Sequence, residues 1–234
     1  MTRSILASSV AACLCFGLSA PLLAAEPPAS ARAAPPSTGP APANANNDKK
    51  LRAAAEPFEK LAETSFEATL PAIDQTIGEA ETAAQEVRAL LPTDAASHLD
   101  AQIAAVKSAR QKQDRAGLAL SSIEVYRILV SAVADGAKVP TEVSLLDYAG
   151  FRYDADLKAS PARWGDMTEA VSFAGENWAK LSPRAKSFQG ASAVEKAIAD
   201  MGKAVAQRDV ALATLSAKTE LDLVDQLETF FTAH

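Results

Sequence analysis

The residues with the clearest chemical potential are carboxylates on lines where a helix should present apolar side chains to the core. One such line reaches Glu124 and Arg127, and a second reaches Asp222 with Asp225 one turn further on. Carboxylates that project inward from the helices of a bundle are a known way of building a metal centre. We therefore expect a cation or ligand site where these two lines come together.

The expected site also takes residues from the segment 138–159, which is rich in acidic and tyrosine side chains. Oxygen ligands favour hard cations, so the metal would be Ca²⁺, Mg²⁺, Mn²⁺ or iron. The chain has no Glu-x-x-His pair of the di-iron type and no calcium-loop pattern, so the pattern does not choose among these ions. The predicted metal ligands are Glu124, Asp147, Asp222 and Asp225, and the predicted ligand-binding residues are Tyr126, Arg127, Tyr148 and Glu228.

Two structural interpretations compete with this site. Arg127 could pair with Asp222 or Asp225 in a buried network that fixes helix register without any ligand. Alternatively, the apolar line of the last helix could shift and turn both aspartates outward. The shifted line would run through Leu221, Val224, Leu227 and Phe231.

Several classes of chemistry are excluded by the residues that remain after export. Both cysteines, Cys13 and Cys15, lie in the N-terminal segment, and the rest of the chain holds two histidines. We therefore expect no zinc–thiolate site, no iron–sulfur cluster and no haem, whose covalent form needs Cys-x-x-Cys-His. No catalytic constellation can be named, so we expect no enzyme.

The first 25 residues have the features of a cleaved signal peptide. They carry Arg3, an apolar stretch, and the small residues Ala24 and Ala25 ahead of Glu26. We predict a periplasmic or secreted protein with no membrane span after cleavage, and a lipoprotein anchored at Cys13 is the minor alternative. Loss of Arg3 leaves 22 basic and 29 acidic residues, a net charge of −7, which argues against nucleic acid as a partner.

Residues 26–48 contain six prolines among small and polar residues, which predicts a disordered linker. The bundle domain should then occupy residues 49–234. Helical periodicity predicts long helices over 57–91 and 93–134, a shorter one over 161–183, and a last one from Ser192. The long helices would each measure about 60 Å and the short one about 33 Å.

These elements predict an all-α, up-and-down antiparallel four-helix bundle with a long packed loop between helices 2 and 3. In that topology the second and fourth helices end at the pole that the loop covers. Two functions fit the prediction. The first is an exported binding protein for a hard metal ion or a small cationic ligand, and the second is an interaction or scaffold module with a protein partner.

Overall fold

The computed structural model describes residues 45–134 and 137–233, and within these ranges every regular element is helical. This confirms the all-α class. The predicted signal peptide lies outside the described residues, as does the predicted linker up to residue 44, while the first helix begins at Ala45. The elements are α1 (Ala45–Thr64), α2 (Leu70–Val87), the 3₁₀ turn η1 (Arg88–Leu90), α3 (Thr93–Gln111), α4 (Arg115–Ser131), α5 (Thr141–Lys158), α6 (Trp164–Leu181), α7 (Ala191–Gln207) and α8 (Val210–Ala233).

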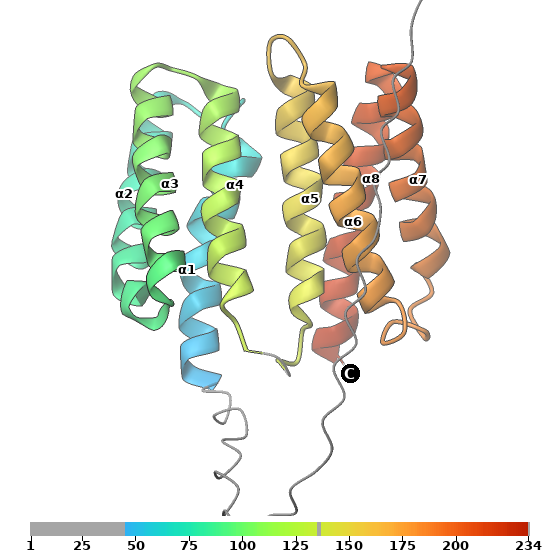
Figure 1. The fold of residues 1–234 in the computed structure, drawn as a ribbon, viewed down its shortest axis with the longest axis horizontal. Coiled ribbons are helices and arrows are strands. Elements are labelled where there is room, and N and C mark those ends of the chain that lie inside the picture. Colours follow the sequence, from blue (N-terminus) through green and yellow to red (C-terminus); the bar gives the residue numbers. More distant parts are fainter. Residues whose placement is uncertain (1–44, 135–136, 234) are drawn as a thin grey trace, which may run out of the picture. The chain divides into compact units, whose positions relative to one another are not determined.

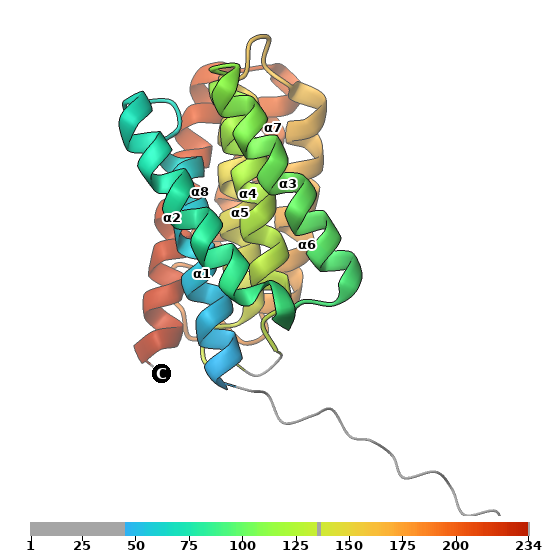
Figure 2. The same ribbon diagram turned by 90° about the vertical axis from the view of Figure 1, so that its left-hand side faces the viewer.

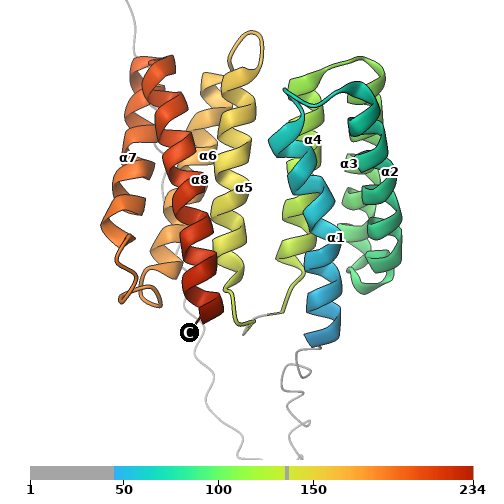
Figure 3. The ribbon, with the colours of Figure 1, turned by 180° about the vertical axis from the view of Figure 1, so that it is seen from behind.

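Successive helices run antiparallel, and the described residues form two four-helix halves within one compact unit (Figure 1). In the first half α1 packs on α2 and α4, and α3 packs on α4. In the second half α5 packs on α6 and α8, and α7 packs on both α6 and α8. The halves meet mainly through α4, the fourth helix of the first half, and α5, the first helix of the second, with lesser contact between α1 and α5. Figures 2 and 3 show α1 and α8 on the same side of α4 and α5.

The predicted four-helix bundle is therefore wrong in its number of helices, because each predicted long helix folds back as a hairpin. The first of these breaks between Thr64 and Leu70. Thr69 caps α2, its hydroxyl oxygen accepting a hydrogen bond from Ala72 N at 3.4 Å. Pro71 then lies in the first turn of α2, where its missing N–H costs nothing, and it does not kink a longer helix.

The other two hairpins reverse through matching turns 95 positions apart. Asp114 caps α4 by accepting from Gly117 N at 2.8 Å, and Asp209 caps α8 by accepting from Leu212 N at 3.0 Å. The residue before each aspartate has a left-handed backbone, with φ of 54° at Gln113 and 50° at Arg208. Neither turn contains the glycine that usually takes this conformation.

The same 95-residue offset relates the helices on either side of these turns. Ile103, Val106 and Ala109 of α3 match Ile198, Met201 and Ala204 of α7, and each pair has the same class of exposure. The alignment needs no gap between residues 96–129 and 191–224. The two halves therefore repeat one helical-hairpin pattern.

The predicted packed loop 138–159 is the helix α5. This helix contacts α4, α6 and α8, with lesser contact to α1, so it is surrounded on most sides. Leu146, Tyr148, Ala149 and Tyr153 are all at most 2% exposed. A helix buried around most of its circumference has no single apolar stripe, and this is why its periodicity did not predict a helix.

Candidate functional site

A small cavity lies where α1, α4, α5 and α8 meet, between the two halves. Its volume is about 20 Å³, room for one water molecule. We call it the junction cavity. Its lining residues are Glu59 from α1, Tyr126 from α4, Val143, Ser144 and Asp147 from α5, and Val224, Asp225 and Glu228 from α8.

The four carboxylates of the junction cavity differ in depth. Asp147 is only 7% exposed and lies at the inner end. Glu59 is half-buried, whereas Asp225 and Glu228 are exposed. The cavity thus has a buried acidic floor and an acidic rim that reaches solvent.

Burial and neighbouring carboxylates raise the pKa values of Glu59, Asp147 and Glu228. Burial first, and then the charge of Glu228, raises the pKa of Glu59 to about 7. Burial, followed by the charge of Glu59, raises the pKa of Asp147 well above its ordinary value, opposed by a hydrogen bond from Tyr126. Burial also raises the pKa of Glu228, and the charge of Arg52 opposes that rise. These three groups therefore release their protons at higher pH than free carboxyl groups do, because burial and neighbouring carboxylates disfavour their charged forms.

Arg52 and Tyr126 organise the polar edge of the cavity. The Arg52 guanidinium donates from Nη2 to Val139 O at 2.9 Å and from Nη1 to Ser144 Oγ at 3.3 Å. It thereby holds the start of α5 against α1. Burial, and then the charge of Asp147, raises the pKa of the Tyr126 hydroxyl, so this group stays a neutral hydrogen-bond donor.

A further carboxyl group lies deeper in the α5–α8 contact. Glu220 is 0% exposed, and neither of its carboxyl oxygens has a hydrogen-bond partner among the described residues. It fits there because Gly150 has no side chain; a Cβ at that position would lie 2.2 Å from Glu220 Oε2. Burial, and then the charge of Asp147, raises the pKa of Glu220 well above its ordinary value.

No protein family, curated protein or solved structure matches this chain. Function is therefore inferred from the chemistry of the junction cavity and its surroundings.

The structure brings together half of the residues predicted from sequence. Asp147, Asp225, Glu228 and Tyr126 all line the junction cavity. Sequence reasoning missed Glu59, which lies on a helix whose start falls inside the predicted linker. No signal for it was present in the sequence, because the exposed positions of α1 carry both lysines and glutamates, as a solvated helix face does.

The other predicted residues lie elsewhere. Glu124 accepts from Arg127 at 2.9 Å and from the Tyr148 hydroxyl, in a separate network between α4 and α5. The Arg127 guanidinium also lies 5.6 Å from the centre of the Tyr148 ring. Arg152 Nη1 donates to the Tyr148 hydroxyl at 3.2 Å, which completes this network. Arg127 therefore pairs with Glu124 and not with the aspartates of α8.

Asp222 is exposed and forms an ion pair with Lys218 at 2.9 Å, away from the cavity. The reason is the shift of the apolar line: Val224, Leu227 and Phe231 are all buried. The alternative interpretation of α8 is thus confirmed for these three residues, whereas Leu221, the first residue of its line, is only partly buried. Asp225 also turns outward, but far enough towards α1 to line the rim of the cavity.

As the side chains stand, no group of three or more Asp, Glu, His or Cys residues in the described chain could hold a metal ion. The junction cavity therefore offers charge and enclosure without a completed metal coordination shell. None of the described helices is long and apolar enough to cross a membrane.

Proposed function

We propose that this protein is an exported, non-enzymatic binding protein that takes up a small cation in the junction cavity. The observation that supports this most directly is that Glu59, Asp147, Asp225 and Glu228 line one enclosed space. In that space Glu228 repels Glu59, and both of them repel Asp147. A bound cation would relieve that repulsion, and ion release would restore it. Because the carboxylates come from both halves, binding would also draw α1 and α8 together.

The geometry favours an ammonium group over a metal ion. An ammonium nitrogen has about the size of the water molecule for which the cavity has room, and it donates hydrogen bonds to carboxylates without a fixed coordination shell. A metal ion would need the helices to shift until three or more oxygens reach coordination distance, since no such group exists as the side chains stand. A hard metal ion is the competing ligand class.

The test is thermal unfolding of the purified protein with methylammonium, Ca²⁺, Mg²⁺ or Mn²⁺ added one at a time, and with EDTA. A ligand that binds the folded state at one hundred times its dissociation constant stabilises it by about 2.7 kcal/mol. We expect methylammonium to raise the unfolding temperature, and Asp147→Asn to abolish the rise. Glu86→Gln, on the exposed side of α2, is the matched control and should keep it.

The outcomes separate the proposed functions. A rise with one of the metal ions that EDTA reverses would replace the ammonium with a metal. If no cation changes the unfolding temperature while Asp147→Asn alone stabilises the protein, the junction cavity is a structural feature. The interaction or scaffold module would then be the better description.

A further inference from the structure

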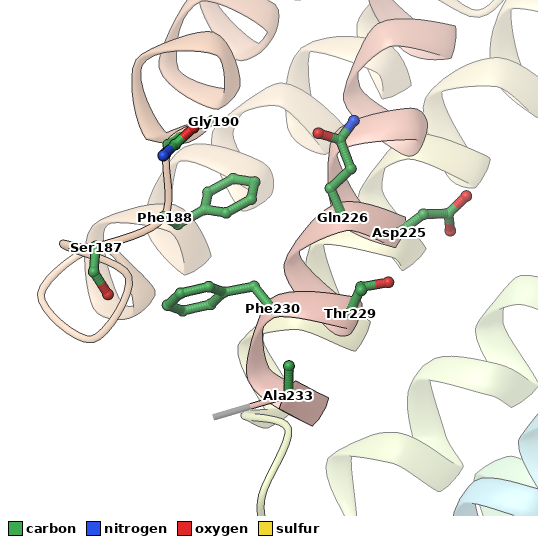
Figure 4. A pocket seen from close by; sticks show the side chains of 9 residues that line it. Ser187, Phe188, Gly190, Asp225, Gln226, Thr229, Phe230 and Ala233 are labelled. Atoms are coloured by element: carbon green, nitrogen blue, oxygen red, sulfur yellow. The ribbon is translucent and has the colours of Figure 1, made fainter.

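A second hollow lies next to the junction cavity, on the other side of α8. It has a volume of about 630 Å³, within the range of small-molecule sites. We call it the aromatic groove, and Figure 4 shows it between the α6–α7 connection and the end of α8. It is lined by Ser187, Phe188, Gln189, Gly190, Asp225, Gln226, Thr229, Phe230 and Ala233.

Two phenylalanine rings form the apolar wall of the groove. Phe188 and Phe230 face each other with their ring centres 5.6 Å apart (Figure 4). Gly190 leaves room for this arrangement, because a Cβ there would lie 2.5 Å from Phe188 Cζ. The aromatic wall therefore depends on glycine at position 190 in the α6–α7 connection as well as on Phe230 of α8.

Asp225 lines both the aromatic groove and the junction cavity. In Figure 4 its carboxylate and the Thr229 hydroxyl point to one side of α8, and the two phenylalanine rings lie on the other. Gln226 projects between them along the helix. The two hollows therefore share Asp225, with the acidic lining on one side of α8 and the aromatic lining on the other.

Charge and shape together determine what such a surface fits. The acidic end requires a positive group, and the aromatic end favours an apolar one. Because an α-helix with its side chains is about 10 Å across, the two groups must be separated by a chain of about that length. A bare metal ion or methylammonium would occupy only the acidic end.

We infer that the ligand is an amphipathic organic cation, with an ammonium head in the junction cavity and an apolar chain that crosses α8 onto Phe188 and Phe230. This inference rests on the proposed function, because it takes the same acidic site as the position of the head group. It adds the chemical class of the ligand and a second set of contacts.

The test compares methylammonium, butylammonium and octylammonium by NMR-detected titration of the purified protein. Full burial of a methylene contributes about 0.8 kcal/mol, close to a fourfold gain in affinity. We expect the dissociation constant to fall by about twofold to fourfold for each methylene that reaches the groove. Asp147→Asn should weaken all three ligands.

Two variants test the groove itself. Phe188→Ala removes half of the aromatic wall, and Ala233→Trp fills the groove from its exposed edge without removing core packing. Both variants should abolish the gain in affinity with increasing chain length and leave the affinity for methylammonium unchanged. Equal affinity for all three ligands would overturn the inference and leave the proposed function intact. An affinity gain with chain length that survives both variants would also overturn it. If the wild type binds none of the three ammonium ions, the inference fails together with the ammonium form of the proposed function.

Discussion

Replacing Glu59 by glutamine should stabilise the protein above neutral pH and leave it unchanged in acid. Glu59 is half-buried beside Glu228 and Glu63, and these surroundings raise its pKa from 4.5 to about 7. The folded state therefore keeps a proton that the unfolded state releases. Because the folded-state pKa is the higher one, stability is lost as the pH rises from about 4.5 to about 7.

The size of the effect follows from the shift in pKa. Each pKa unit corresponds to 1.36 kcal/mol, so a shift from 4.5 to about 7 sets an upper limit of about 3 kcal/mol. The partial exposure of Glu59 reduces this limit, because solvent screens its repulsion from Glu228 and Glu63. We expect Glu59→Gln to raise the free energy of unfolding by about 1–2 kcal/mol at pH 8 and by little at pH 4.

The measurement is urea unfolding followed by circular dichroism at pH 4, 6 and 8, for the wild type, Glu59→Gln and the surface control Glu86→Gln. The difference in the free energy of unfolding between Glu59→Gln and the wild type should increase from pH 4 through pH 6 to pH 8. Glu86→Gln should show no such increase. An equal difference at pH 4 and pH 8 would refute the repulsion argument. A wild type that gains stability relative to Glu59→Gln as the pH rises would refute it more strongly.

Three other predictions concern the turns and the α5–α8 contact, each measured by thermal or urea unfolding. Gln113→Gly and Arg208→Gly should each stabilise the protein by up to about 1 kcal/mol, because glycine adopts the left-handed backbone without strain; a loss of stability would contradict this. Asp114→Ala should cost about 1 kcal/mol through loss of the cap of α4. Gly150→Ala should cost about 1–3 kcal/mol through collision with the Glu220 carboxyl group. Adding Glu220→Ala should recover part of that cost, and strict additivity in the double variant would show that the two residues do not touch.

Most helical segments were predictable from sequence, with α5 as the exception, but the places where the chain turns back were not. Apolar spacing continues across each turn, because both helices of a hairpin face the same core. The turns at Gln113 and Arg208 use left-handed residues other than glycine, and so leave no usual breaking signal. The 95-residue repeat, with Asp114 and Asp209 at matching positions, was the available sign that the second and the last predicted helices share one hairpin pattern.

The candidate site was predictable in part, for reasons that differ between its helices. Asp147 stood out because its segment was polar and tyrosine-rich, even though that segment is a helix and not a loop. Glu124 sits on a line that faces α5, so its side chain enters the helix contact with Tyr148 instead of reaching the cavity. Glu59 gave no signal, since its partners Asp147 and Glu228 are about 90 and 170 residues away in sequence, and their proximity depends on how the two halves meet.

The junction between the halves links the stability of the protein to its proposed function. On the α4–α5 side, Arg127 forms an ion pair with Glu124, and the Tyr148 hydroxyl donates a hydrogen bond to the same carboxylate, so the charge of Glu124 is compensated. On the α1–α8 side, Glu228 repels the ionised form of Glu59, and this repulsion lowers stability above about pH 7 when no cation is bound. The same repulsion would supply part of the affinity, because a cation that relieves it stabilises the folded state by the same amount. Glu59→Gln should therefore stabilise the free protein and weaken ammonium binding together. A variant that became both more stable and a tighter binder would show that the two are not linked.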